Sequence, residues 1–265
     1  MRSYVPDYDL VIAKDLSDAL ELLASDAGWR PIAGGTDLMV LFNAGKLPFR
    51  KLVSTRDLHE LRGISVMDDH VTIGAGVTYT QIRNSTVLKS EFPLLCQAAS
   101  WTGGVANQNR GTLGGNVANA SPAADSAPVL LVYNAELCLV SKRGRRWIPY
   151  RDFHLGYKQF AMKTDELILE FRLPRSTTLT HHYGRKVGTR KAQAISKVSI
   201  AVAAEKQERT LTDIRVALGS ECCRAELGRR LWRSTWSQGN TFPLPYHARR
   251  HDRSHCRAGW RDDHG

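Results

Sequence analysis

The sequence predicts an α+β fold, because helical and strand patterns follow one another along the chain without a solenoid-type repeat. Residues 16–23 carry Leu or Ala at the spacing of one helix face, and Gly28 follows where such a helix would end. Residues 167–171 instead place apolar side chains at every second position, as a half-buried strand does. The mixture of the two periods indicates the α+β class, with a domain boundary near residue 175.

The individual elements follow from local patterns of apolar, glycine and proline residues. A hairpin is expected where two strand patterns flank a basic turn. A later strand, over residues 165–173, is expected to end at Pro174. In chain order we expect a helix over residues 16–23, a strand over 30–33, a helix over 38–42, strands over 52–54 and 71–75, a helix ending near 82, a helix over 92–101, a long irregular stretch over 103–119, a hairpin of 136–140 and 146–149, and strands over 165–173, 197–204 and 213–218.

Length and composition are those of an ordinary globular protein. The 265 residues suffice for two modest domains, and 42% are hydrophobic and 24% charged. No apolar run approaches the roughly 18 to 20 residues of a membrane span, and the N-terminal residues lack a signal core. We expect a soluble, cytoplasmic protein without a membrane span.

The net charge of +11 raises the question of nucleic acid. Arg and Lys are scattered, except for a cluster over residues 142–146 that is typical of a solvated hairpin tip. Aromatic residues are not interleaved with them, as a single-strand groove would require. We predict no nucleic-acid binding. A basic surface facing acidic partner subunits is the alternative to a merely solvated surface, which we favour.

Cysteine and histidine residues do not form a recognisable metal motif. The five cysteines show no C-x-x-C pair, and the adjacent Cys222 and Cys223 lack a matching second pair. The neighbouring His181 and His182 are interpreted as solvent-exposed. We predict no metal ligands in this chain and no acid–base pair or nucleophile.

Residues 221–265 differ in composition from the rest. They hold nine Arg but no Lys, Val or Ile, and three of the six Trp. A folded segment of this length without a β-branched aliphatic residue is improbable. A disordered basic tail is one interpretation, but the Trp and Cys content argues against it. The composition favours a reading-frame change after Ser220, and we assign this tail no function.

Two glycine pairs, Gly34-Gly35 and Gly114-Gly115, suggest a phosphate site. A diphosphate needs donors close to its oxygens, and glycine lets backbone N–H groups converge on an anion. Each pair is flanked by short polar residues, Thr36 after the first and Thr112 before the second. A single Gly-Gly is usually a tight turn, so the evidence lies in the two together. The G-x-G-x-x-G pattern of a Rossmann unit and the P-loop pattern are both absent.

These loops and further segments closely resemble the flavin subunits of the molybdenum hydroxylase family, which includes xanthine dehydrogenase, aldehyde oxidoreductase and carbon monoxide dehydrogenase. The resemblance runs in order over residues 4–220. The segments that carry it are residues 31–38 (PIAGGTDL), 112–116 (TLGGN), 120–128 (ASPAADSAP), 153–158 (FHLGYK), 165–168 (DELI), 195–198 (ISKV) and 216–220 (VALGS).

The resemblance implies a two-lobed FAD-binding domain of the p-cresol methylhydroxylase type over residues 1–175, with a lobe boundary near 55. A small α+β C-terminal domain would begin within residues 176–220. The family's chain normally continues with a helical finish that residues 221–265 do not match, which puts the stability of this domain in doubt. Some relatives of the wider fold attach flavin covalently to a histidine where this chain has Thr36, so FAD is expected to be non-covalent.

The same resemblance implies the cofactor-binding residues. Asp125 would accept from the ribityl or ribose hydroxyls, Lys197 would approach the flavin ring, and Leu167 or Ile168 would meet it. The alternatives are a helix cap for Asp125, a surface lysine for Lys197, and plain core for the other two. The residues implied to bind FAD are Ile32, Ala33, Gly34, Gly35, Thr36, Asp37, Leu38, Thr102, Thr112, Leu113, Gly114, Gly115, Asn116, Asp125, Leu167, Ile168 and Lys197.

The implied function is an FAD-dependent oxidoreductase subunit that transfers electrons. A partner subunit would carry the molybdenum cofactor and another would carry 2Fe–2S clusters. Electrons would pass through this FAD to NAD or another acceptor, and the 153–158 and 165–168 segments look most like the xanthine dehydrogenase type. The alternatives are a self-contained flavin oxidase of the same fold and a non-catalytic nucleotide-binding module.

Overall fold

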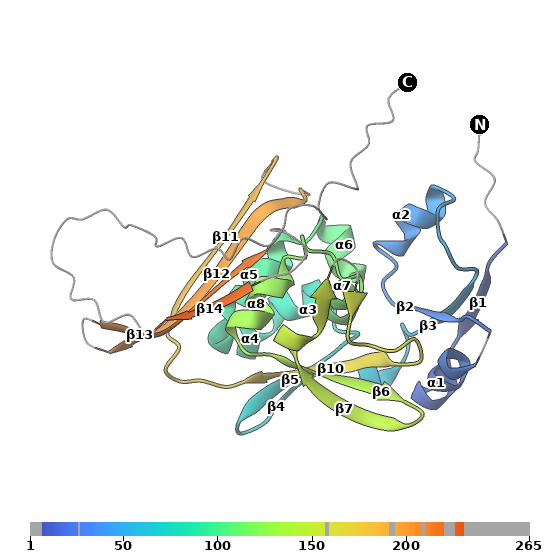
Figure 1. Ribbon diagram of the computed structural model, residues 1–265, viewed down its shortest axis with the longest axis horizontal. Coiled ribbons are helices and arrows are strands. Elements are labelled where there is room, and N and C mark those ends of the chain that lie inside the picture. The colour runs from blue at the N-terminus through green and yellow to red at the C-terminus, as the bar shows by residue number, and fades with distance from the viewer. Residues whose placement is uncertain are drawn as a thin grey trace.

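The computed structural model describes residues 7–25, 27–156, 159–190, 194–207 and 210–219, and the backbone of 226–230. Within them a small parallel sheet, a larger antiparallel sheet, a layer of short helices and a second antiparallel sheet follow one another (Figure 1). The α+β class predicted from the sequence is confirmed. Tyr157, Lys158, Cys222, Cys223 and most of the atypical tail lie outside the described residues.

The first part of the chain forms a three-stranded parallel sheet in the order β1-β3-β2. Helix α1 begins where the Asp15 side chain accepts a hydrogen bond from the Asp18 N–H at 2.8 Å, and it buries its leucine face. Parallel neighbours need such a crossover helix between them. The elements are β1 (Asp9–Ile12), α1 (Leu16–Ala24), β2 (Arg30–Ile32), α2 (Leu38–Asn43) and β3 (Lys51–Ser54).

A five-stranded antiparallel sheet follows, in the order β4-β5-β10-β6-β7. Strand β10 pairs on both edges, which explains why its apolar run is nearly continuous and buried. The predicted hairpin is formed by β6 and β7. The bounds are β4 (Ile64–Val66), β5 (His70–Gly74), β6 (Glu136–Ser141), β7 (Gly144–Pro149) and β10 (Leu167–Pro174), with a small pair of β8 (His154–Gly156) and β9 (Gln159–Phe160), and short 3-10 turns at His59–Leu61 and Tyr150–Asp152.

In the described residues six short helices form a layer between this sheet and the last one, and two of them contradict the expected irregular stretch over residues 103–119. That stretch folds as α6 and α7, separated at Gly111. Its Gly and Asn content lowers helix propensity, but Thr112 caps the second helix and tertiary contacts hold both, so local propensity is overridden. The helices are α3 (Tyr79–Asn84), α4 (Thr86–Glu91), α5 (Pro93–Trp101), α6 (Val105–Arg110), α7 (Leu113–Ala118) and α8 (Ser126–Val132).

The last sheet is antiparallel, in the order β11-β12-β13-β14, and it covers α5 and α8. Strand β11 was not expected from the sequence. Within it His182 is half-buried, not solvent-exposed as predicted, because it faces the helices and its ring lies 5.9 Å from that of Tyr133. The strands are β11 (His181–Gly188), β12 (Ser196–Gln207), β13 (Thr210–Gly219) and β14 (Glu226–Arg230), the last within the atypical stretch.

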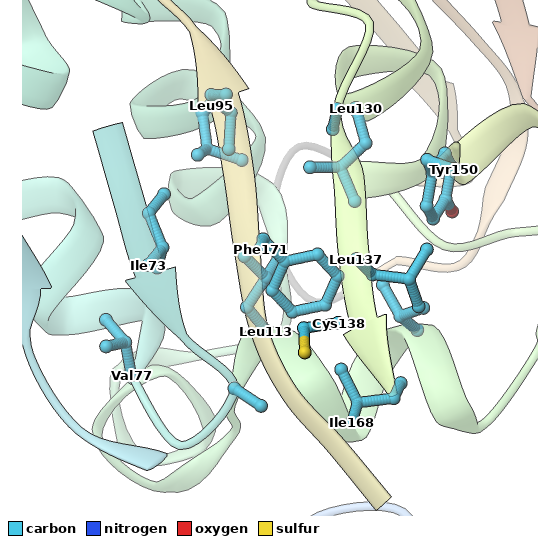
Figure 2. Close-up of a cluster of buried hydrophobic side chains, with 14 of the residues drawn as sticks. Ile73, Val77, Leu95, Leu113, Leu130, Leu137, Cys138, Tyr150, Ile168 and Phe171 are labelled. Atoms are coloured by element: carbon cyan, nitrogen blue, oxygen red, sulfur yellow. The ribbon is translucent and has the colours of Figure 1, made fainter. Parts of the chain in front are cut away.

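The main core lies where the five-stranded sheet meets the helices. Figure 2 shows Phe171 of β10 beside Leu137 and Cys138 of β6, with Leu113 of α7 packed against them. Phe171, Leu137 and Leu113 are fully buried. Leu113 therefore fixes the start of α7 on the sheet, and with it the second glycine pair.

Candidate functional site

A cavity of about 590 Å³ lies between the three-stranded sheet and the helices that cover the five-stranded sheet. Its size is within the range of about 300–1,000 Å³ typical of cofactor sites. Three separate stretches of chain line most of it: the loop after β2, the stretch from the end of α5 through α7, and the region from β9 to the start of β10. Both glycine pairs face this cavity.

The first glycine loop presents unpaired backbone donors. The N–H groups of Gly34, Gly35 and Thr36 make no hydrogen bond to any described residue. Gly35 has φ +73°, a left-handed conformation that side chains rarely adopt. Successive N–H groups around such a residue can turn toward one point and form an anion-binding concavity.

The backbone of Gly34 lies directly against the backbone of Arg110 and Gly111. A Cβ placed on Gly34 would lie 1.8 Å from the carbonyl oxygen of Arg110, at the end of α6. No side chain fits there without separating the two segments. The glycine is required by this close approach, whereas Gly35 is required by its backbone angle.

The second glycine loop differs from the first, because its donors are already used. The N–H of Gly114 donates to Ala75 O at 2.9 Å, and that of Asn116 donates to Thr112 O at 3.0 Å. The N–H of Gly115 donates to the Thr112 hydroxyl at 3.1 Å. A Cβ on Gly114 would lie 2.6 Å from that of Ala75. These hydrogen bonds hold the loop in place. It lines the cavity with the backbone of its two glycines and with the side chains of Thr112 and Asn116.

Most residues that the sequence implied for cofactor binding line this one cavity, and four do not. Ile32 lies in β2, where its carbonyl accepts from the Thr55 N–H at 3.0 Å, and Leu113 is buried in the core. Asp125 and Lys197 also lie outside the lining. The implied residues that line the cavity are Ala33, Gly34, Gly35, Thr36, Asp37, Leu38, Thr102, Thr112, Gly114, Gly115, Asn116, Leu167 and Ile168.

Asp125 is buried in an ion pair. One carboxylate oxygen accepts from Lys186 Nζ at 2.7 Å, and the other accepts from the Ser196 hydroxyl at 2.6 Å. Burial raises the pKa of the Asp125 carboxyl above its ordinary value, and these two hydrogen bonds offset part of the rise. Asp125 stands at the start of α8, but its side chain makes no cap hydrogen bond.

The lysine that turns inward is Lys186, whereas Lys197 is exposed. Sequence reasoning missed Lys186 because it did not identify β11 as a strand. The signal was present: Gly184 and Gly188 alternate with exposed residues and share the inward face with Lys186. Small residues on that face allow the strand to approach α5 closely, since a Cβ on Gly184 would lie 3.0 Å from Leu94.

Other lining residues were not expected from the sequence. They include Thr55, Gly76, Tyr79, Asn107 and Phe160. A sequence pattern does not single them out, because each comes from an element that passes the cavity only in the folded chain.

A second cavity of about 280 Å³ adjoins the first and shares Gly34 and Thr112 with it. Arg56, Arg62 and Arg110 line it, and the described residues around it include no carboxylate. Arg62 is paired with Asp57 outside the lining. The side of the first glycine loop that faces this second cavity is therefore basic, which favours an anion there, whereas Asp37 at the end of the loop lines the main cavity.

Two further features concern the described residues only. No group of three or more His, Cys, Asp or Glu side chains among them is placed to hold a metal ion. No helix in the described part of the chain is long and apolar enough to cross a membrane.

Comparison with known proteins gives a consistent result. Residues 6–176 match the family described as FAD binding domain in molybdopterin dehydrogenase. The chain is similar to the xanthine dehydrogenase FAD-binding subunit of Escherichia coli O157:H7, with 33% identity over 78% of this chain and 72% of that protein. It is also similar to the glyceraldehyde dehydrogenase medium chain of Sulfolobus acidocaldarius, with 30% identity over 82% of this chain and 76% of the relative.

Solved structures agree with these sequence relatives. Carbon monoxide dehydrogenase from Hydrogenophaga pseudoflava superposes with a TM-score of 0.81 and 26% identity, over 84% of this chain and 78% of that chain. Quinoline 2-oxidoreductase from Pseudomonas putida 86 gives a TM-score of 0.79 at 26% identity, over the same shares of the two chains.

Proposed function

This chain belongs to the family of FAD-binding domains of molybdopterin dehydrogenases, and we propose that it serves as the electron-transferring flavin subunit of a xanthine dehydrogenase type molybdenum hydroxylase. In that role FAD is bound without a covalent link. The molybdenum cofactor and the 2Fe–2S clusters belong to partner subunits, and NAD or another acceptor takes the electrons. The complex works in the cytoplasm.

The first glycine loop is the observation that carries the FAD proposal. The N–H groups of Gly34, Gly35 and Thr36 have no partner among the described residues, and they lie beside a cavity of cofactor size. Gly34 and Gly35 are half-buried and Thr36 is exposed, so a ligand in the cavity can reach these donors, and a diphosphate would accept hydrogen bonds from several of them at once. The neighbouring arginines favour the same negative charge. The residues present therefore fit a dinucleotide.

Each lining group has a separate task in this proposal. When bound, FAD supplies the exchange between single-electron donors and two-electron acceptors. The first loop holds the diphosphate, and the anchored second loop keeps the opposite wall rigid and close. Leu167 and Ile168 pack against the apolar part of the cofactor and exclude water from it. Lys186 and Asp125 lie outside the lining, and their ion pair joins β11 to the start of α8.

The xanthine type of substrate rests on the relatives' names. The Escherichia coli relative is named for xanthine dehydrogenase, but others are named for glyceraldehyde dehydrogenase, caffeine dehydrogenase and nicotinate dehydrogenase. Substrate chemistry belongs to the partner that holds molybdenum, so this chain's cavity does not select it. Co-purification with its partners, followed by assay with purines and NAD, tests this part. Turnover of another substrate class with no purine turnover would contradict it.

The flavin role has a direct test. We expect the purified chain to bind FAD and to show the yellow absorbance of oxidised flavin, which an added reductant bleaches. A colourless protein with no affinity for FAD would overturn the proposal. Retention of FAD without reduction would favour a nucleotide-binding module, and rapid oxidation of a small substrate by the chain alone would favour a self-contained oxidase.

A further inference from the structure

The last sheet has two faces of opposite character. Helices α5 and α8 lie against one of them (Figure 1), and the side chains on that face are small. Ala201, Ala203 and Ala217 stand there and are at most 2% exposed. Small side chains let the strands approach the helices closely, so this face belongs to the packed interior.

The opposite face, here called the outer face, carries large side chains instead. The strand register sets them in two rows across β11, β12 and β13, which are Tyr183–Val202–Val216 and Arg185–Ile200–Leu218. Tyr183 is 53% exposed, and the four aliphatic side chains of these rows are only half-buried. The outer face is therefore open to solvent in a single chain, as far as the described residues show.

This distribution is the reverse of that in a solvated sheet. An antiparallel sheet with one face in water normally carries polar side chains on that face. In the two rows the central strands β12 and β13 present only aliphatic side chains, and the polar groups of Tyr183 and Arg185 stand on the edge strand β11. An apolar centre with a polar rim is typical of a protein–protein interface, and a contiguous exposed apolar patch indicates one.

A second copy of the chain suits this face best. The stretch that follows β13 is unsuited to it by composition, because residues 221–265 contain nine Arg and neither Val nor Ile. A second copy brings the same aliphatic rows, and a two-fold axis makes one patch complementary to itself. Two sheets pack in this way through their apolar faces, about 10 Å apart.

The size of the sheet is sufficient for such a contact. Strands β11, β12, β13 and β14 comprise 8, 12, 10 and 5 residues. At about 3.3 Å per residue and about 4.8 Å between strands, the face spans about 550 Å². Two faces in contact would bury about 1,100 Å², which is just above the roughly 1,000 Å² expected of a specific interface. A dimer of this size should dissociate on dilution.

We propose that two copies of this chain pack through the outer face of β11, β12 and β13 and form a homodimer. The described lining of the main cavity takes no residue from these three strands. The dimer therefore leaves the candidate site open, and the inference does not depend on the proposed function.

The experiment measures association of the full chain by sedimentation velocity over a series of concentrations. The test variant is Val202→Thr/Val216→Thr, two residues directly paired across β12 and β13. Threonine keeps the branched shape and suits a strand, but two hydroxyls would be buried in each half of the interface. We expect the unchanged chain to dimerise as concentration rises, and the variant to dimerise at least about tenfold more weakly.

The matched control is Val66→Thr/Val105→Thr, which makes the same change at two exposed positions outside the last sheet. It should dimerise within about twofold of the unchanged chain. Tyr183→Ala is a second test variant, because its half-exposed side chain on an edge strand can be removed without loss of the fold. We expect it to weaken the dimer at least about fivefold. Thermal unfolding at low concentration confirms that each variant is folded.

Three results would contradict the inference. An unchanged chain that stays monomeric at every concentration has no such dimer. If this monomer also loses thermal stability in Val202→Thr/Val216→Thr, the chain itself covers the outer face. A dimer that forms equally well in both test variants uses another surface.

Discussion

Lys186 Nζ lies 2.7 Å from the Asp125 carboxylate and 3.0 Å from the carbonyl oxygen of Trp101. The lysine belongs to β11 and the aspartate stands before α8, so the pair joins the last sheet to the helices beneath it. The two side chains are only 13% and 6% exposed. A pair this deeply buried stabilises the protein only while both partners are present.

We expect Lys186→Met to destabilise the chain by about 3 kcal/mol, because it leaves the Asp125 charge buried without its main partner. The matched control is Lys197→Met on the neighbouring strand, where the lysine is exposed. It should change the free energy of unfolding by less than about 0.5 kcal/mol. Urea unfolding of both variants measures this. Equal effects of the two substitutions would contradict the assignment of Lys186 as the structural partner.

Gly35→Ala should cost both stability and FAD affinity, whereas Gly28→Ala should cost stability alone. The two glycines have nearly the same backbone angle, φ +73° and +74°, so an added Cβ strains each by about 1–2 kcal/mol. Gly28 has open space around it and does not line the cavity, but Gly35 sits among the unpaired N–H groups. FAD titration should show about tenfold or greater weakening for Gly35→Ala only. If both variants bound FAD as the unchanged chain does, the first loop would not be the diphosphate site.

Glu166 should make stability depend on pH in the acid range. Arg146 donates to both of its oxygens, at 2.8 and 2.7 Å, and these bonds hold the pKa of Glu166 below its ordinary 4.5 although burial opposes them. The unfolded chain therefore takes up this proton first as pH falls. The stabilisation is fully present above about pH 5.5 and is lost as pH falls through 4.5 and below.

Replacing Glu166 by Gln should therefore lower stability at pH 7 by about 1–2 kcal/mol and make the loss on acidification shallower. Glu136→Gln is the control, because that carboxylate is 39% exposed and lies 3.9 Å from Arg172. Unfolding free energies measured at several pH values between 7 and 3.5 test the difference. Parallel curves for Glu166→Gln and the unchanged chain would contradict it.

Helices and strands were predicted best from the sequence where the apolar side chains recur with the period of that element. The helix around Leu20 and the strand around Phe171 form as expected, because burial and periodicity agree there. The prediction failed over residues 103–119, where a threonine cap and hydrogen bonds to Ala75 and Val77, just after β5, outweigh the poor helix propensity of Gly and Asn. Local composition does not report such tertiary support.

The candidate site was predictable in its residues more than in its geometry. Glycine pairs indicate close backbone approach, but they do not say what approaches: Gly35 lines the cavity, whereas at Gly34 the carbonyl of Arg110 occupies the place of a side chain. The inward turn of Lys186 depends on strand register and on a partner far along the chain. It cannot be derived from spacing in the sequence alone.

The contact between Gly34 and Arg110 has a kinetic consequence. Because main chain meets main chain there, rotation of a side chain cannot widen the cavity at this edge. A molecule as long as a dinucleotide can then enter or leave at this edge only when whole segments move apart, which is slower than rotamer exchange. Release of the cofactor should accordingly be slow compared with electron transfer through it, so that one cofactor molecule serves many turnovers.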